Sequence, residues 1–446
     1  MLQIFRWHEP TKPVYLITMS AIGSDSWINA DEFESGDELH NRATDFVAKI
    51  DWEALTSLAS KLRDGINCHV SDKFSLGQFN MVRRIVFEDG TSWVSRLRLP
   101  ELKSVFGHRE ALDVRSSMQV EIATMAYLRY VQREPCDLLF LVAVQLIHLH
   151  RAKTSVPVPE VFSHDLDEKN SIGAPYILMG YINGNVAEEL RNARGCEFAV
   201  YGTAPQNERF SKQMASVQVQ LAYQTFNQIG SLYQDGDGFK IGPELETGQG
   251  PWNEPDEYYT ALASHALSVA ESDAPPEARQ SKAFALPNMF PELMRLYGTT
   301  GQEGPFSLVN RDFGAHNVLV DDEFSIVGVI DFDGVMAAPI EKVAQFPLFM
   351  GLERPIPGHV ETRPKALELR QKRAPLLERY CEYVKEAAAG QAAVAGQEKP
   401  CNLAEHLLSD AASISRGLDR YGAHQKDVNE RWLAAYEMFM RNKKDN

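Results

Sequence analysis

The stretch that decides the fold reads LVNRDFGAHNVLV from Leu308 to Val320 and resumes as VGVIDFDGV from Val327 to Val335. Short apolar runs on both sides of the polar turn DDEF are typical of two paired strands. Each stretch contains an Asp-Phe pair, at Asp312 and at Asp331, and the first pair spells Asp-Phe-Gly in full. The spacing therefore predicts two carboxylates at the two ends of one short hairpin.

The residues around this hairpin are those that phosphoryl transfer requires. Such a reaction needs a carboxylate near the acceptor hydroxyl, metal ligands beside the phosphates and a cation that contacts them. Asn317 lies five positions after Asp312, and Asp331 lies fourteen positions after Asn317. The pattern predicts that Asp312 accepts or orients the hydroxyl proton. Asn317 and Asp331 would then give oxygens to Mg²⁺, which prefers hard oxygen ligands.

NRDFGAHNVLV followed by VIDFDG resembles the catalytic loop and metal-binding segment of the aminoglycoside phosphotransferase family, and more narrowly of its fungal, protein-kinase-like members. The resemblance implies that the obvious Asp-Phe-Gly belongs to the catalytic loop and that Asp331 takes the metal-binding role. It leaves Asp333 open between a secondary ligand and a surface carboxylate. Asn310 stands where the family usually has His. Because an amide also donates and accepts hydrogen bonds, this departure bears on turnover rather than on fold.

Segments upstream of the hairpin agree with the resemblance. FSLGQFNMV, from Phe74 to Val82, lies where a turn should cover the nucleotide, and Gly77 is its one glycine. SWVSRLRLP resembles the strand that carries the phosphate-facing cation. Arg96 is the first choice for that cation, and Arg98, two residues on and therefore on the same strand face, is the second. Glu121 then corresponds to the helix carboxylate that pairs with the cation.

ILMGYINGN, from Ile177 to Asn185, resembles the hinge between two lobes. There the resemblance places Met179 and Tyr181 against the adenine, partly through backbone groups. His316, which precedes Asn317, is interpreted as a residue that packs the loop rather than as a base.

Together these segments predict an α+β, bilobal, protein-kinase-like fold with a small antiparallel β-rich N-lobe and a larger, mainly helical C-lobe. The expected divisions are an N-terminal extension with one amphipathic helix (residues 1–65), the N-lobe (66–182) and the C-lobe with both loops (183–446). Residues 134–153 show no capping signal and no clear period. They are interpreted as an insertion, such as an intron retained in the message, and a genuine buried helix is the alternative.

Local patterns predict several elements of these lobes. A helical period over residues 51–65 starts at a possible N-cap, Asp51, and ends at Gly65. Asp89-Gly90 is a strong hairpin signal. In the C-lobe we expect one long amphipathic helix over residues 212–233 and a loop of low complexity over residues 387–400.

The composition of the chain argues against several classes of partner. The 446 residues are 44% hydrophobic and 24% charged, which is normal for globular proteins, and the net charge is −16. An acidic balance argues against nucleic acid and anionic membrane as main partners. The five cysteines form no C-x-x-C pair, which argues against a zinc site and favours a reducing compartment. No signal peptide is recognisable, and the apolar run Leu138–Ile147 is far shorter than the roughly 20 residues of a membrane span, so we expect a cytoplasmic protein.

We therefore expect an ATP- and Mg²⁺-dependent phosphotransferase that acts on a hydroxyl of a small molecule. The sequence does not fix the acceptor, the oligomeric state or the choice of ATP over GTP. One alternative is a kinase-shaped nucleotide-binding or scaffold protein with weak or no catalysis, which Asn310 and residues 134–153 favour. A protein kinase proper is less favoured, because no A-P-E segment follows Asp331.

Overall fold

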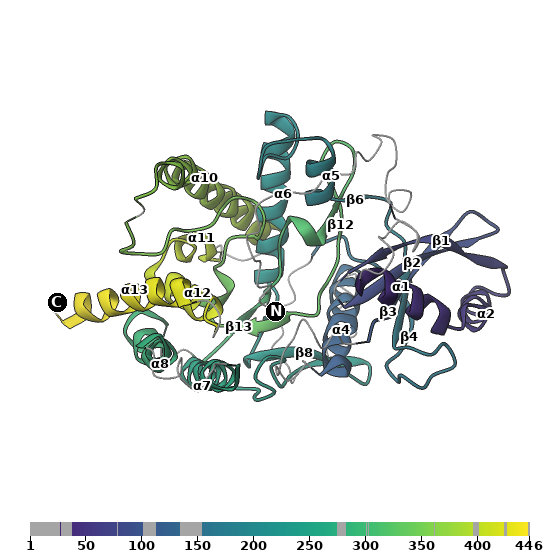
Figure 1. Ribbon diagram of the computed structural model, residues 1–446, viewed down its shortest axis with the longest axis horizontal. Helices are drawn as coiled ribbons and strands as arrows, with labels where there is room; N and C mark the ends of the chain where they lie inside the picture. Colours follow the sequence, from purple (N-terminus) through teal and green to yellow (C-terminus); the bar gives the residue numbers. More distant parts are fainter. Residues whose placement is uncertain are drawn as a thin grey trace.

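Two lobes of unequal size make up the chain in the computed structural model (Figure 1). The smaller lobe holds the early part of the sequence, and the C-terminus lies at the far end of the larger lobe. The suspected insertion at 134–153 lies outside the described residues. The structure describes residues 27, 38–77, 79–100, 113–133, 154–273, 282–299, 301, 303–360, 362–395, 401–422 and 426–444.

The small lobe is built on an antiparallel sheet, and its described elements are α1 (Glu38–Lys49), α2 (Trp52–Leu62), β1 (Cys68–Leu76), β2 (Asn80–Phe87), β3 (Ser92–Arg98), α4 (Val114–Arg133), β4 (Val161–Asp165) and β5 (Tyr176–Gly180). The strand order is β1-β2-β3-β5-β4. Side chains alternate between the two faces of β3. Trp93 and Leu97 pack with α1 and α2, whereas Val94 packs with α4. Arg96 shares the face of Val94 and is therefore directed toward α4.

The helix predicted over residues 51–65 is α2, and a second helix, α1, precedes it. The Asp51 carboxylate accepts a hydrogen bond from the Ala54 N–H at 2.8 Å, as an N-cap does. Phe46 of α1 and Leu55 of α2 are buried in one apolar cluster with Met81 of the sheet. We therefore propose that the small lobe begins at α1, and that its core includes part of the expected N-terminal extension.

The large lobe combines helices with short strands. Its five-stranded sheet has the order β7-β10-β13-β8-β9 in the described part of the chain, and a three-stranded sheet has the order β12-β11-β6. The elements are β6 (Asn185–Val186), α5 (Ala187–Ala193), α6 (Ala204–Ala222), β7 (Thr225–Phe226), β8 (Gly230–Asp235), β9 (Gly238–Gly242), α7 (Pro255–Asp273), η4 (Lys282–Phe284), α8 (Ala285–Tyr297), β10 (Phe306–Asn310), η5 (Ala315–Asn317), β11 (Val318–Val320), β12 (Ile326–Val329), β13 (Val335–Ala338), α9 (Ile340–Val343), α10 (Pro364–Ala395), α11 (Leu403–His406), α12 (Asp410–Asp419) and α13 (Lys426–Lys444).

Two predictions for this lobe are wrong in part. The helix expected over residues 212–233 ends at Ala222, and the rest forms β7 and the start of β8. Gly230 has a φ of 150°, and a Cβ there would lie 2.2 Å from the Gly242 backbone oxygen, so the approach of β9 requires glycine. The loop expected over residues 387–400 is helical as far as Ala395, because a run of alanines favours helix.

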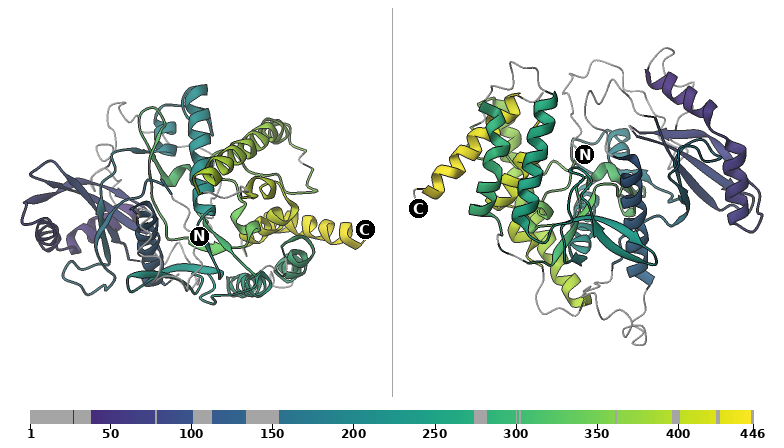
Figure 2. Two further views of the ribbon diagram at one scale, coloured as in Figure 1. Left: turned by 180° about the vertical axis from the view of Figure 1, so that it is seen from behind. Right: turned by 90° about the horizontal axis from the view of Figure 1, so that it is seen from below.

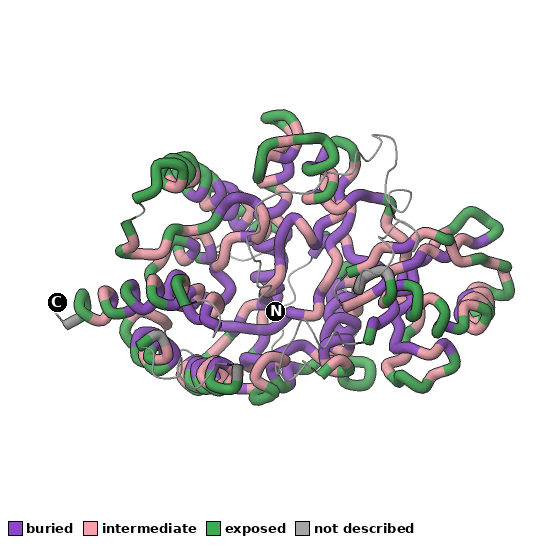
Figure 3. The backbone as a smooth tube through the Cα atoms, in the orientation of Figure 1, coloured by how far each residue is buried: buried purple, intermediate pink, exposed green. Residues whose placement is uncertain are grey.

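Helix α4 joins the two lobes. The Tyr127 hydroxyl donates to Gln224 Oε1 at 3.1 Å, and the Tyr127 ring lies 5.5 Å from that of Phe226 in β7. The two views in Figure 2 also show α4 between the sheet of the small lobe and the large lobe. Figure 3 shows that buried segments continue from this region into the large lobe, while the outer helices carry exposed faces. Side chains on α4 therefore face the boundary between the lobes.

Within the described ranges, no helix combines the length and the apolar character that crossing a membrane requires.

Candidate active site

The segment that resembles a catalytic loop, residues 311–317, starts where β10 ends and is called the catalytic loop below. β10 pairs with β13 in the large-lobe sheet, and η5 and β11 follow the loop. Asn317, at the end of η5, donates from Nδ2 to the Asp312 backbone oxygen at 3.0 Å and to Asp312 Oδ2 at 3.2 Å. No described residue donates a hydrogen bond to the Asn317 amide oxygen, so this oxygen is available to a ligand. The loop thus brings Asp312 and Asn317 together, as predicted.

Asn310 connects the two aspartate segments. Its Nδ2 donates to the backbone oxygen of Asp331 at 3.0 Å, and its Oδ1 accepts the Asp312 N–H at 3.0 Å. The side chain is buried, with 4% exposure. The amide therefore acts as donor and acceptor at once, and it holds the backbones of both segments.

Asp331 follows β12 in a strained backbone conformation. Its φ is 63°, in the left-handed region that residues other than glycine rarely adopt. The neighbouring Ile330 N–H donates to the Asn317 backbone oxygen at 3.0 Å, and Asn310 holds the Asp331 carbonyl. Strain of this kind concentrates at functional sites, where the surrounding structure maintains it. The hairpin β11–β12 therefore returns Asp331 to the catalytic loop.

Arg96 crosses the boundary between the lobes. Its Nη1 lies 2.9 Å from Glu121 Oε1 on α4, and its Nη2 lies 3.0 Å from Asp331 Oδ1. The exposed fractions of the side chains are 11% for Arg96, 3% for Glu121 and 31% for Asp331. Arg98, the second choice, has its guanidinium over the Phe79 ring at 4.8 Å. Of the two arginines, Arg96 is therefore the one that pairs with Glu121, the carboxylate on α4.

Carboxylates outnumber their cations at this boundary. Burial raises the pKa of Glu121, and although Arg96 opposes this shift, Asp331 and Asp333 add to it. Burial and the Asp331 charge raise the pKa of Asp333 to about 6. The Ser117 hydroxyl of α4 donates to Asp333 Oδ2 at 3.3 Å, so Asp333 faces the small lobe rather than bulk solvent. A cation bound here would relieve the repulsion between these carboxylates.

The donor set fits Mg²⁺ in the presence of a phosphate ligand. Among the described residues, no three His, Cys, Asp or Glu side chains form a group able to hold a metal ion. Mg²⁺ is usually bound by one or two carboxylates together with substrate phosphates and water, so a complete protein cage is not required. Asp331 and the Asn317 amide provide hard oxygens of that kind, beside carboxylates that carry excess negative charge.

The predicted nucleotide contacts lie on the small lobe and the hinge. Gly77 is in the turn between β1 and β2, where its N–H donates to the Asn80 backbone oxygen at 2.9 Å. Met179 is a buried residue of β5. Tyr181 follows β5, and the Arg84 guanidinium lies 4.6 Å from its ring centroid. These contacts do not test whether the three residues bind a nucleotide, and that role stays a prediction.

His316 lies against the proposed base. Its Nε2 is 3.2 Å from Asp312 Oδ2, and its ring makes an edge contact with Phe349 at 4.7 Å between centroids. Neither ring nitrogen forms a directed hydrogen bond with a described residue. The contact with Phe349 agrees with the packing role that we expect for His316.

Sequence reasoning missed Arg311 beside the catalytic loop, an arginine whose side chain is 9% exposed. Arg311 Nη1 lies 2.8 Å from Glu244 Oε1 and 2.9 Å from Glu246 Oε2. The Glu244 side chain is fully buried, and it also accepts hydrogen bonds from the Glu246 N–H and from the N–H and hydroxyl of Thr247. Burial alone would raise the pKa of Glu244, but Arg311 and these hydrogen bonds lower it. The only sequence signal is an arginine directly before Asp312.

These features define a class of protein. An antiparallel small lobe, an arginine–glutamate pair between β3 and α4, and a catalytic loop that faces a second aspartate form a bilobal, protein-kinase-like α+β fold, as predicted. Residues 143–341 match the model of the phosphotransferase enzyme family. The matched segment includes the hinge, the catalytic loop and Asp331, and over this segment the chain resembles that family.

Solved structures that match the chain include proteins described as phosphotransferases of aminoglycosides and macrolides. A protein described as a candidate aminoglycoside phosphotransferase from Ralstonia eutropha has 14% identity and a TM-score of 0.49, with 89% of this chain and 99% of that chain covered. Macrolide 2'-phosphotransferase MphH from Brachybacterium faecium has 16% identity and a TM-score of 0.41, with 86% and 97% covered. No curated protein matches the chain. The narrower resemblance to fungal members stays a prediction.

Proposed function

We propose that this protein transfers the γ-phosphoryl group of ATP to a hydroxyl of a small molecule, in a reaction that depends on Mg²⁺. The observation that supports the proposal most strongly is the connection of two loops through Asn310. This amide holds the backbones of Asp312 and Asp331, while Asn317 contacts Asp312 directly. The three groups that the reaction needs thus lie on one hydrogen-bonded framework.

Asp312 is the proposed catalytic base. Its carboxylate takes or orients the proton of the acceptor hydroxyl as the hydroxyl oxygen bonds to the γ-phosphorus. The bond between that phosphorus and the β–γ bridging oxygen breaks, and ADP leaves with the electron pair. The Asn317 amide supports the base, because its Nδ2 donates to the carboxylate at 3.2 Å and fixes its orientation.

Asp331 and Asn317 are the proposed metal ligands. When bound, Mg²⁺ would neutralise charge on the β- and γ-phosphate oxygens. Arg96 is held by the buried Glu121, so its guanidinium keeps a fixed position next to Asp331, where phosphates can meet it. Gly77 is proposed to cover the phosphates, and Met179 and Tyr181 to contact the adenine at the hinge.

The proposed setting is a reducing, cytoplasmic one. The described cysteines, Cys68, Cys196, Cys381 and Cys401, are free. Free thiols persist in reducing compartments, where disulfides are rare.

A binding measurement with a matched control tests this proposal. We expect the purified chain to bind Mg·ATP in isothermal titration calorimetry. Asp331→Ala should weaken this binding by more than about tenfold, since even the loss of a residue that only hydrogen-bonds to a metal ligand costs about that much. Asp322→Ala is the control, because Asp322 belongs to the same hairpin but pairs with Arg194 at the surface. An Asp331→Ala variant with unchanged affinity contradicts the proposed metal site.

A nucleotide-binding protein without turnover is the second candidate. It is favoured by Asn310 in place of the usual His, and by the ion pair that Asp331 makes with Arg96. An ATP-consumption screen against hydroxylated metabolites separates the two. Consumption of ATP with any acceptor supports the transferase, whereas tight binding of Mg·ATP without consumption supports the second candidate.

A further inference from the structure

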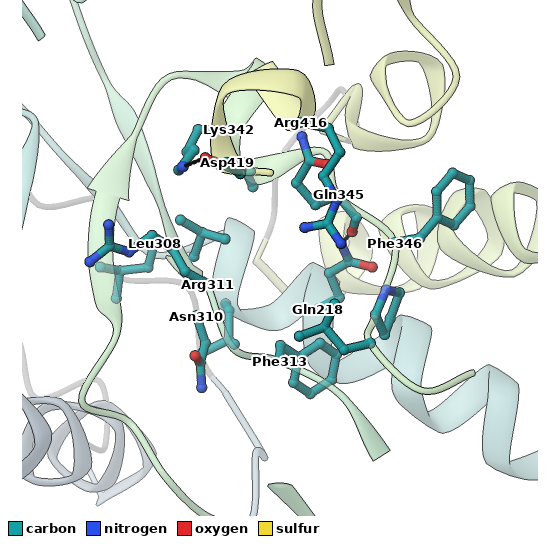
Figure 4. A pocket seen from close by; sticks show the side chains of 15 residues that line it. Gln218, Leu308, Asn310, Arg311, Phe313, Lys342, Gln345, Phe346, Arg416 and Asp419 are labelled. Atoms are coloured by element: carbon teal, nitrogen blue, oxygen red, sulfur yellow. Dashed lines mark hydrogen bonds and ion pairs between the residues drawn. The ribbon is translucent and has the colours of Figure 1, made fainter. Parts of the chain in front are cut away.

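A small cavity lies behind the catalytic loop and is not used by the proposed reaction. Its volume is about 40 Å³, and it is lined by residues of β10 and the loop after it, residues 342–348, α6 and α12. Figure 4 shows the side chains that line it. One water needs roughly 10–15 Å³ on the same scale, so the cavity can hold about three waters or one small polyatomic ion.

The cations that line the cavity are not balanced by the anions. Arg311 is paired with Glu244 and Glu246, and Lys342 contacts Asp419 closely. Both of these cations therefore have carboxylate partners. Arg416 of α12 remains, and it carries a positive charge for which the lining provides no second carboxylate.

The N–H groups of the Arg416 guanidinium have no acceptor among the described residues. Within the described ranges, its guanidinium makes no hydrogen bond and no ion pair, although Figure 4 shows its side chain reaching from α12 toward Gln218 and Gln345. Burial and the nearby Arg420 lower the pKa of Arg416 to about 10, and Asp419 and Glu353 offset only part of this shift. Nearby carboxylates therefore balance only part of the positive charge of Arg416.

The neutral polar groups of the cavity do not compete for a ligand. Gln218 Nε2 donates to the Gln345 backbone oxygen at 2.7 Å. Gln345 Nε2 donates to the backbone oxygens of Glu341 and Ala412 at 2.9 and 3.1 Å. Asn310, the third amide in the lining, is engaged by Asp331 and Asp312. Among the described side chains of the lining, the guanidinium of Arg416 therefore has N–H donors available for a ligand, and a charged guanidinium prefers an anion.

We propose that this cavity binds a small monoanion through Arg416, either as a free ion of the size of formate or as the carboxylate of a larger molecule. The ligand would connect α12 with the rear of the catalytic loop. This site is separate from the proposed metal and nucleotide contacts, and the proposal does not depend on phosphoryl transfer.

A thermal-unfolding series with formate as the probe tests the site. A ligand that binds only the native state raises its stability in proportion to ln(1 + [L]/Kd). At 100 mM sodium formate we expect a rise in Tm of about 1–3 °C over sodium HEPES of equal ionic strength. Equal Tm values in the two salts overturn the proposal.

Variants locate the effect at the cavity. Arg416→Met should lose the rise in Tm with formate. Arg420→Gln, one helical turn further along and outside the lining, should keep it. Because Arg416 is undercompensated, its replacement by Met should leave a folded protein in HEPES. A formate response that persists in Arg416→Met places the anion elsewhere and also overturns the proposal.

A larger carboxylate distinguishes the two sources. Sodium gluconate carries a carboxylate on a chain that the cavity cannot enclose. If gluconate gives the same Arg416-dependent rise as formate, the cavity accepts a carboxylate that reaches in from a larger molecule. If formate alone gives the rise, the cavity holds a free ion.

Discussion

Two largely buried arginines, Arg96 and Arg311, lie beside the catalytic loop. Their surroundings differ, and we expect Arg96 to serve ligand binding and Arg311 to serve stability. Arg96 lies between Glu121 and Asp331, at 2.9 and 3.0 Å. Arg311 lies between Glu244 and Glu246, at 2.8 and 2.9 Å. The distances are alike, yet the pKa of Glu121 is raised and that of Glu244 is lowered.

The surroundings of the two glutamates explain the opposite directions. Glu244 accepts three hydrogen bonds from Glu246 and Thr247 in addition to its ion pair, so its charge is fully compensated. Glu121 faces the further carboxylates of Asp331 and Asp333. In the Arg311 cluster, which consists of Arg311, Glu244 and Glu246, protein groups therefore balance the buried charge. In the Arg96 cluster, which consists of Arg96, Glu121, Asp331 and Asp333, negative charge is left for an external cation.

The largest expected effect concerns the loop between the two clusters. Asp312→Asn should lower the rate of ATP consumption with any acceptor found in the screen by about 10²–10⁴-fold, the usual contribution of a general base. Its affinity for Mg·ATP should stay within about twofold of the parent, because the base does not hold the metal. A variant with the parent rate would show that Asp312 is not the base.

Next in size is the loss of stability when the Arg311 cluster is broken. Arg311→Met leaves Glu244 buried without its cation, and we expect the free energy of unfolding in urea to fall by about 3–5 kcal/mol. Arg194→Met, which removes a surface ion pair, should cost no more than about 1 kcal/mol. Equal losses in the two variants would show that the buried cluster has no special role in stability.

A smaller effect is expected at the Arg96 cluster. Arg96→Met should lower the affinity for Mg·ATP by about tenfold, which corresponds to about 1.4 kcal/mol. Its loss of stability should be smaller than that of Arg311→Met, because Glu121, with its raised pKa, can take up a proton when the cation is removed. Calorimetry and urea unfolding measure the two quantities. If Arg96→Met lost stability but no affinity, the two clusters would serve the same purpose.

The smallest effect is a dependence of stability on pH. Since the pKa of Glu244 is lower in the folded chain, the unfolded chain binds more protons, and stability rises with pH in that range. The contribution is present above the ordinary glutamate pKa and is lost as pH falls through the folded value. Glu244→Gln should therefore flatten the acid side of the stability curve. The raised pKa of Glu121 makes stability fall as pH rises, so Glu121→Gln should remove a fall where Glu244→Gln removes a rise. If both substitutions changed the slope of stability against pH in the same direction, the two glutamates would not differ as proposed.

Sequence reasoning found the parts of the site that follow from local spacing. The pairing of β11 with β12, the return of Asp331 to the loop and the contact between Asp312 and Asn317 all come from one short stretch of chain. The Arg96–Glu121 pair spans separate elements, and there the family resemblance supplied the link. These residues were predictable because each has a distinct residue type at a fixed place.

Contacts that depend on tertiary packing could not be predicted in the same way. Nothing in the sequence near Glu244 shows that its loop returns to Arg311, 67 positions later by the difference of the two residue numbers. The strand after Ala222 was missed because its helical period continues until Gly230, where the close approach of β9 decides the conformation. In both cases a distant segment, rather than the local pattern, determines the outcome.

The position of a bound metal ion shows whether Asp331 and Asn317 hold the metal together. Crystals of the chain grown with Mn²⁺ and AMP-PNP allow the ion to be located by its anomalous scattering. We expect one peak about 2.1 Å from a carboxylate oxygen of Asp331 and from the amide oxygen of Asn317, next to the phosphates. A nucleotide bound with the ion elsewhere, and with Asp331 still paired only with Arg96, would contradict this expectation.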